Sequence, residues 1–285
     1  MGELDGRVAM VTGGARGQGR VHALSLAARG CDVAVCDIVA PMDTVPYDLA
    51  SPSDLAETAR LVEEQGRKCL TAVTDVRDSG QVGQAVETVM ATFGRLDILV
   101  ANAGICSFAP VADLTDQAWE EMVATNLSGV FKSVRAVVPH MVQARSGRIV
   151  ATSSMGGRMG MPNLAHYVAA KWGVIGLIKS VALELAPHGV TANVVCPATV
   201  DTAMAHNPAM YGLFCPDLVD PGRDEVRPAY ERMNPMRVPW LDPRDVADAV
   251  AFLVSDGARH ISGGHHRGVG RGQRPDALSL LLADV

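Results

Sequence analysis

The sequence predicts an α/β protein built as one doubly wound domain, in which helices cover both faces of a parallel sheet. Three observations predict it. Short apolar runs rich in Val, Ile and Ala alternate with amphipathic stretches of helical period. A glycine-rich turn follows the first apolar run directly and opens a helix. No linker or low-complexity segment divides the 285 residues, so we expect a single domain.

The elements follow from the apolar pattern in chain order. Strands buried on both faces read as continuous apolar runs, and such runs lie at 7–13, 32–37, 68–75, 96–104, 147–154 and 190–197. Helices are predicted between and after them at 53–65, 79–93, 117–142, 165–186 and 243–256. Before the first of these helices, Ser51 is a candidate N-cap, with Pro52 at the first helical position and Asp54 at the third.

Two segments interrupt this alternation. Residues 38–50 are longer than the usual strand-to-helix connection of about 2–6 residues. Residues 206–243 hold seven of the sixteen prolines together with Tyr211, Phe214, Tyr230 and Trp240. That composition favours an ordered lid over a substrate. The alternative for both segments is an excursion on the surface.

Composition and charge argue against several other classes of protein. The net charge is −6 and no basic domain is visible, which disfavours nucleic-acid binding. No apolar window reaches the roughly 20 residues of a membrane helix, and the N-terminus does not resemble a signal peptide. The six cysteines, at 31, 36, 69, 106, 196 and 215, show no metal-ligand spacing. We therefore expect buried thiols, no metal site and a cytoplasmic location.

The stretch "VTGGARGQG" at 11–19 predicts a Rossmann-type dinucleotide site. Its glycines, at 13, 17 and 19, permit a tight turn, and the N-terminus of the following helix attracts phosphate. Asp37 ends the next strand, where a carboxylate accepts hydrogen bonds from ribose hydroxyls and repels a 2′-phosphate. NAD is therefore favoured over NADP. Arg16 argues for NADP, but no second basic residue stands beside Asp37, whose other interpretation is a plain turn residue.

The third and fourth predicted strands end in further candidate ligand contacts. Asp75 could meet an adenine amino group, and Asn102–Gly104 offers small residues where a ribose passes closely. Ligands bind at the carboxyl ends of such strands. The alternative for both segments is a strand-end turn.

Four residues suit proton transfer to or from an alcohol oxygen: Asn126, Ser154, Tyr167 and Lys171. A free tyrosine, with a pKa of about 10, is a poor base at neutral pH. A lysine cation four residues away on one helix would lower that pKa. Ser154 can hold the substrate oxygen, and Asn126 can retain a water that relays the proton from the lysine side.

These motifs together resemble the short-chain dehydrogenase/reductase family over residues 5–263: "TGGARGQG", Asp37, "DV" at 75–76, "NAG" at 102–104, Asn126, Ser154, "YVAAK" and "PATVDT" at 197–202. The resemblance implies a catalytic tetrad of Asn126, Ser154, Tyr167 and Lys171, a homotetramer, and contacts from Val200 and Thr202 to the nicotinamide carboxamide. Ala198 departs from the usual Pro-Gly. The cofactor-binding set that it implies is Gly13, Arg16, Gly17, Gln18, Gly19, Asp37, Asp75, Val76, Asn102, Ala103, Gly104, Tyr167, Lys171, Pro197, Val200 and Thr202.

A narrower resemblance points to the mycofactocin-associated branch, which includes carveol dehydrogenases. It lies in "ARGQGR", "DTVPYDLAS", "PNLAHYVAAK" and "VPWLDPRDV". It implies that the 38–50 loop covers NAD, that a redox carrier such as mycofactocin re-oxidises it in place, and that the substrate is an apolar, cyclic alcohol. Candidate pocket walls are Met155, Met159, Tyr211, Phe214 and Trp240. The alternatives are a hydroxysteroid or 3-oxoacyl reductase with exchangeable cofactor, and a catalytically impaired NAD-binding protein.

The alternating apolar pattern ends after Gly263. Gly, Arg and His dominate the start of 264–285, so we predict that the last strand of the sheet is lost and the tail disordered, which would impair oligomer contacts. A shift of reading frame explains this change, and a genuinely divergent tail is the alternative. The domain is therefore expected to span 1–263, with 206–243 as its lid.

Overall fold

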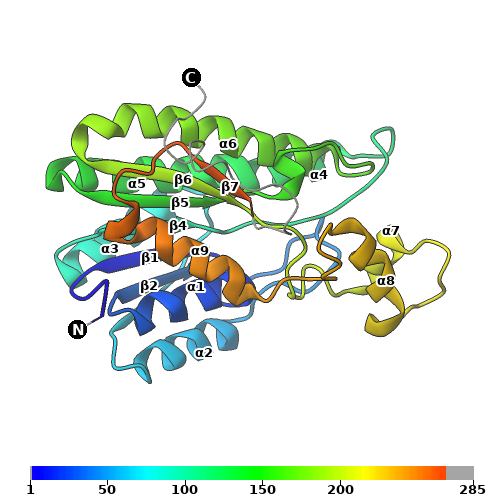
Figure 1. The fold of residues 1–285 in the computed structure, drawn as a ribbon, viewed down its shortest axis with the longest axis horizontal. Helices are drawn as coiled ribbons and strands as arrows, with labels where there is room; N and C mark the ends of the chain where they lie inside the picture. The colour runs from blue at the N-terminus through cyan, green and yellow to red at the C-terminus, as the bar shows by residue number, and fades with distance from the viewer. Residues whose placement is uncertain (1, 268–285) are drawn as a thin grey trace.

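A parallel sheet of seven strands forms the centre of residues 2–267, which are the residues that this computed structural model describes (Figure 1). Its strand order is β3-β2-β1-β4-β5-β6-β7. The order reverses between β1 and β4, which are neighbours, and this is where doubly wound sheets bind ligands. The predicted fold class is confirmed. The strands are β1 Val8–Thr12, β2 Asp32–Asp37, β3 Cys69–Val73, β4 Ile98–Ala101, β5 Gly147–Thr152, β6 Val190–Cys196 and β7 His265–Arg267.

Helices cover both faces of the sheet (Figure 1). One face carries α1 Gly17–Ala28, α2 Pro52–Glu63 and α9 Pro243–Val254. The other carries α3 Ser79–Phe93, α5 Gly129–Ala144 and α6 Ala165–Leu185. Two further helices, α7 Pro208–Phe214 and α8 Arg223–Met233, lie beyond the sheet within the predicted lid. Among the described residues no helix is long and apolar enough to cross a membrane.

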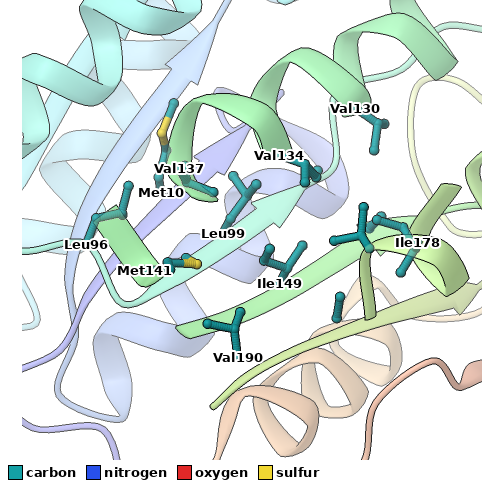
Figure 2. Close-up of a cluster of buried hydrophobic side chains, with 14 of the residues drawn as sticks. Met10, Leu96, Leu99, Val130, Val134, Val137, Met141, Ile149, Ile178 and Val190 are labelled. Atoms are coloured by element: carbon teal, nitrogen blue, oxygen red, sulfur yellow. The ribbon is translucent and has the colours of Figure 1, made fainter. Parts of the chain in front are cut away.

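Alternate residues of each strand supply two separate apolar cores. Met10, Leu99 and Ile149 face α5 and α6, as Figure 2 shows. Their neighbours in sequence, such as Val11 and Val100, belong to the core under α1 and α9. Successive side chains of a strand point to opposite faces, so both faces of these strands must be apolar.

Local capping fixes where α2 begins. Ser51 accepts a hydrogen bond from the Asp54 backbone N–H, and the Asp54 carboxylate accepts one from the Ser51 N–H at 2.9 Å. Pro52 occupies the first turn. This capping box holds the C-terminal end of the 38–50 loop and confirms the predicted helix start.

The helix predicted at 117–142 is interrupted. It comprises α4 Asp116–Val123, a π-helical turn Ala124–Ser128, and α5. Asn126 lies in the π turn. Such turns are rare and occur mainly at functional sites.

The sheet continues beyond Gly263, which differs from our expectation that the last strand is lost. His265–Arg267 forms the short strand β7, parallel to β6, with Val194 opposite His265. Backbone hydrogen bonds form this pairing whatever the side chains are, so an apolar pattern was not needed to continue it. The remainder of the tail, 268–285, lies outside the described residues.

Candidate active site

A cavity of about 1500 Å³ opens at the carboxyl ends of the strands. It is large enough for a dinucleotide and a small substrate together. Every residue of the predicted cofactor-binding set lines it, as does Ser154. Asn126 does not line it; its neighbour Thr125 does.

The glycine turn brings the backbone of β1 against that of β4. A Cβ on Gly13, whose φ is +64°, would lie 2.7 Å from the Ala103 Cα, and one on Gly19 would lie 2.0 Å from the Gly13 carbonyl oxygen. The Asn102 amide donates to the Thr12 and Gly13 carbonyls at 3.2 and 3.1 Å. Helix α1 begins at Gly17, so its N-terminal N–H groups adjoin the cavity. The site therefore fits a phosphate-bearing ligand.

Asp37 is held in place at the end of β2. One of its carboxylate oxygens accepts from the Ala15 N–H at 3.0 Å and the other from the Val39 N–H at 3.3 Å. The Arg16 guanidinium donates to the Asp48 carbonyl in the 38–50 loop. This contact gives Arg16 a structural partner and weakens the case for a 2′-phosphate. Asp75, also at the cavity, pairs with Arg77 at 2.8 Å.

The Tyr167 phenol and the Ser154 side chain lie beside each other at the other end of the cavity. Ser154 follows β5 and its hydroxyl accepts from the Gly156 N–H at 3.1 Å. Burial raises the pKa of Tyr167, and the neighbouring Ser154 side chain lowers it by a smaller amount. The phenol is therefore protonated at neutral pH in the chain without ligand.

Lys171 lies one helical turn after Tyr167 on α6. Its Nζ donates to the Thr152 carbonyl at 2.9 Å and lies 5.7 Å from the centroid of the Tyr167 ring. Burial lowers the pKa of Lys171 to about 8. We expected the lysine charge to lower the pKa of Tyr167, but burial of the phenol is the larger effect and acts in the opposite direction.

The Asn126 side chain fixes the backbone that adjoins Tyr167 and Lys171. Its Oδ1 accepts from the Ile105 N–H and its Nδ2 donates to the Ile105 carbonyl, both at 2.8 Å. A Cβ on Gly104 would lie 3.3 Å from Asn126 Oδ1 and 3.4 Å from Lys171 Nζ. Glycine at 104 thus lets the segment after β4 pass between the amide and the ammonium group.

Methionine and aromatic side chains wall the space next to Tyr167. Of the predicted walls, Met155, Met159 and Phe214 line the cavity. Tyr211 and Trp240 do not; they pack around the buried Tyr230 ring beside His206. Sequence reasoning missed several wall residues, because only tertiary packing brings these separate segments together: Met161, Leu164, Met204, Met210, Tyr230 and Met233.

The 38–50 loop also lies at the cavity, through Met42, Tyr47 and Leu49. Besides the Arg16 contact, two hydrogen bonds fasten it. The Cys106 N–H donates to the Tyr47 hydroxyl at 3.0 Å, and the Thr44 hydroxyl donates to the Glu121 carboxylate at 2.5 Å. Tyr47 was missed as a site residue, although "PYDLAS" marks an apolar, ordered loop.

Fold and site together define an oxidoreductase of the dinucleotide-binding, doubly wound class. The family model for short chain dehydrogenases matches residues 7–209. The chain belongs to the short chain dehydrogenase family.

Known relatives are similar to this protein over nearly the whole chain. The (−)-trans-carveol dehydrogenase of Rhodococcus erythropolis is 43% identical over 265 residues, which covers 92% of this chain and 96% of that protein. A 3-oxoacyl-[acyl-carrier-protein] reductase of Staphylococcus aureus is 37% identical over 90% of this chain and 93% of its own. The crystal structure of carveol dehydrogenase from Mycobacterium avium in complex with NAD has a TM-score of 0.92 at 43% identity, covering 94% of this chain and 97% of that one.

Proposed function

We propose that this protein interconverts a secondary, apolar and cyclic alcohol and its ketone by hydride transfer, with Tyr167 as the general acid/base. Membership of the family makes the chain an NAD-dependent oxidoreductase that acts on CH–OH groups. The observation that carries the finer proposal is that Ser154 and Tyr167 lie together beside a methionine-rich wall, in the same cavity as the glycine turn.

NAD fits the residues that are present. The Gly13–Ala103 approach leaves room only for backbone, and the Gln18 Oε1 atom is buried with no hydrogen-bond partner among residues 2–267. Asp37 suits a ribose diol. Thr202 lies next to the glycine turn, because a Cβ on Gly17 would be 3.5 Å from its methyl group. NAD, when bound, supplies the nicotinamide ring that exchanges hydride with the alcohol carbon.

The chain's own residues handle the proton. Ser154 holds the substrate oxygen by hydrogen bond. During reduction the Tyr167 phenol donates its proton to that oxygen. During oxidation the phenol first releases its proton to solvent, and the phenolate then takes the proton of the alcohol. Lys171, with its pKa lowered to about 8, carries charge at neutral pH and favours the phenolate as it forms. Asn126 fixes the Ile105 backbone beside this pair.

The 38–50 loop supports retention of the cofactor. Its three fastenings would have to open before a dinucleotide beneath it could leave. A redox carrier of the mycofactocin kind would then re-oxidise NAD in place. A homotetramer and a cytoplasmic location stay predictions.

A 3-oxoacyl reductase with exchangeable cofactor is the second candidate, because the Staphylococcus aureus reductase is 37% identical. Dilution followed by analysis of the nucleotide that stays with the protein separates the two. Retained NAD favours the first candidate, and loss on simple dilution favours the second.

The proposal is tested by oxidation of a panel of cyclic secondary alcohols with an artificial electron acceptor. We expect turnover by the wild type and a loss of about 10³-fold in kcat for Tyr167→Phe, within the usual range for a general acid/base. NAD content should be equal in both proteins. A wild type that binds NAD but oxidises no alcohol and reduces no ketone of the panel would overturn the proposal in favour of a binding protein.

A further inference from the structure

Three consecutive residues after β4, Ile105–Ser107, contact the 38–50 loop on one side and the catalytic helix on the other. We name them the bridge segment. The Cys106 N–H donates to Tyr47 Oη at 3.0 Å. The next residue, Ser107, is hydrogen-bonded through Oγ to His166 Nε2 at 2.9 Å. His166 directly precedes Tyr167 on α6.

The Ser107–His166 contact is shielded from water. Ser107 is 7% exposed and His166 is 0% exposed. Burial lowers the pKa of His166, so the ring is neutral at pH 7. Its Nδ1 has no hydrogen-bond partner among the described residues, which leaves the Ser107 hydroxyl to orient the ring. Breaking a buried hydrogen bond leaves an unpaired polar group, so this contact resists rearrangement.

Apolar packing links the same three elements. Met42 of the loop and Ile105 of the bridge segment belong to one cluster, against which Leu49 and Tyr167 pack. Tyr47 and Tyr167 both pack on a second cluster that contains Cys106 and Leu164. Because protein interiors are closely packed, a shift of one of these side chains displaces its neighbours.

We propose that Tyr47, Ser107 and His166 are positioning residues that couple closure of the 38–50 loop to the placement of the Tyr167 hydroxyl. The inference rests on the proposed function, since Tyr167 is taken as the acid/base. With the loop closed, Tyr47 holds the Cys106 backbone, Ser107 holds His166, and Tyr167 faces Ser154 from a fixed first turn of α6. The loop thus acts on the chemistry as well as covering the cofactor.

Two variants of the same loop test the coupling. Tyr47→Phe keeps the ring but removes the oxygen that accepts from Cys106. Thr44→Val is the comparison variant: it removes a different fastening of the loop, the hydrogen bond from Thr44 to Glu121 on α4, and Thr44 does not line the cavity. We expect Tyr47→Phe to lower kcat about tenfold and to shift the pH profile of kcat, with KM for the alcohol changed less than twofold. Thr44→Val should release NAD faster, but it should lower kcat less than Tyr47→Phe does, because Tyr47 still holds Cys106.

A double-mutant cycle sharpens this result. Ser107→Ala should also lower kcat, and the Tyr47→Phe/Ser107→Ala double variant should lose less than the product of the two single losses, because both act through one chain of contacts. Equal kcat for Tyr47→Phe and the wild type, or losses that multiply, would overturn the coupling.

Amide hydrogen exchange on the NAD-loaded protein gives a readout that needs no substrate. Tyr47→Phe should speed exchange in peptides covering 102–109 and 160–171, whereas Thr44→Val should speed it only in 38–50 and 116–123. Unchanged exchange at 160–171 in Tyr47→Phe would overturn the coupling. If instead the wild type turns over no substrate, the proposed function fails and the exchange comparison still decides the coupling.

Discussion

The two ends of the cavity are held in different ways. At the end that holds the glycine turn and Asp37, which we call the adenosine end after the proposed position of NAD, the backbone defines the site. Gly13 and Ala103 meet at a distance that excludes a side-chain atom, and Asp37 is fixed by two backbone N–H groups. At the chemical end, side chains define it. Lys171 and Asn126 are each held by hydrogen bonds to carbonyl or N–H groups far away in the sequence.

This difference determines what each end tolerates. Where two backbones touch, one added carbon must separate them, so the adenosine end is sensitive to added volume. Where buried polar side chains hold one another, removal of a single partner leaves an unpaired group, so the chemical end is sensitive to lost hydrogen bonds.

The largest effect is expected for Gly13→Ala. The new Cβ would lie 2.7 Å from the Ala103 Cα at a φ of +64°, so the turn must move. We expect the variant to lose bound NAD entirely. Its free energy of unfolding should be about 3 kcal/mol lower than that of the wild type. Gly83→Ala is the control, because nothing lies within 4 Å of its Cβ in α3. It should be stabilised by about 0.5–1 kcal/mol. Nucleotide analysis and urea unfolding measure both; NAD retained by Gly13→Ala would contradict the close-contact account.

Asp37→Ala probes the same end by removing charge without adding volume. The loss of charged hydrogen bonds to a ribose diol costs about 2 kcal/mol, or roughly thirtyfold in NAD affinity. NADP binding should improve relative to NAD, because the repulsion of a 2′-phosphate is gone. Calorimetric titration of nucleotide-free protein with both cofactors measures the ratio. An unchanged ratio would assign Asp37 to the turn alone, through its bond to Ala15.

Most of the adenosine end could be predicted from the sequence. Glycine spacing, a following helix and an acid at the end of the next strand are local features, and all of them lie within residues 11–37. The strand positions were predictable for the same reason, since burial on both faces leaves continuous apolar runs. β7 was not, because His265–Arg267 pairs with β6 through its backbone and has no apolar pattern.

The chemical end was predictable only in its residue types. "YVAAK" and Ser154 are visible in the sequence, but the burial that raises the pKa of Tyr167 depends on distant segments. Tyr47 lies 120 residues before Tyr167, and neither its contact with Cys106 nor the Ser107–His166 pair leaves a local signal. The π turn at Asn126 was hidden for a related reason, because its one-residue shift keeps helical periodicity nearly intact.

The smallest effect is expected for His22. Its buried imidazole ring, unpaired among the described residues, destabilises the folded state beside the adenosine end. His22 lies in α1, is 0% exposed, and neither ring nitrogen has a hydrogen-bond partner within residues 2–267. Burial lowers its pKa from 6.5 to about 4. His22 is therefore protonated near pH 6.5 in the unfolded chain but only near pH 4 in the folded chain. The free energy of unfolding is highest above pH 6.5 and falls as the pH decreases below that value.

At pH 5.5 this uptake should lower the free energy of unfolding by about 1.4 kcal/mol relative to pH 7.5. His22→Leu removes the titrating group at similar volume, so its own decrease over that interval should be smaller by the same amount. Urea unfolding of both proteins at the two pH values measures the difference, and the other histidines cancel because both proteins contain them. Equal decreases would mean that water or a nearby group satisfies the imidazole. The helix that presents its N-terminus to the cofactor would then be held by a polar contact, and the contrast between a backbone-built end and a side-chain-built end would be weaker.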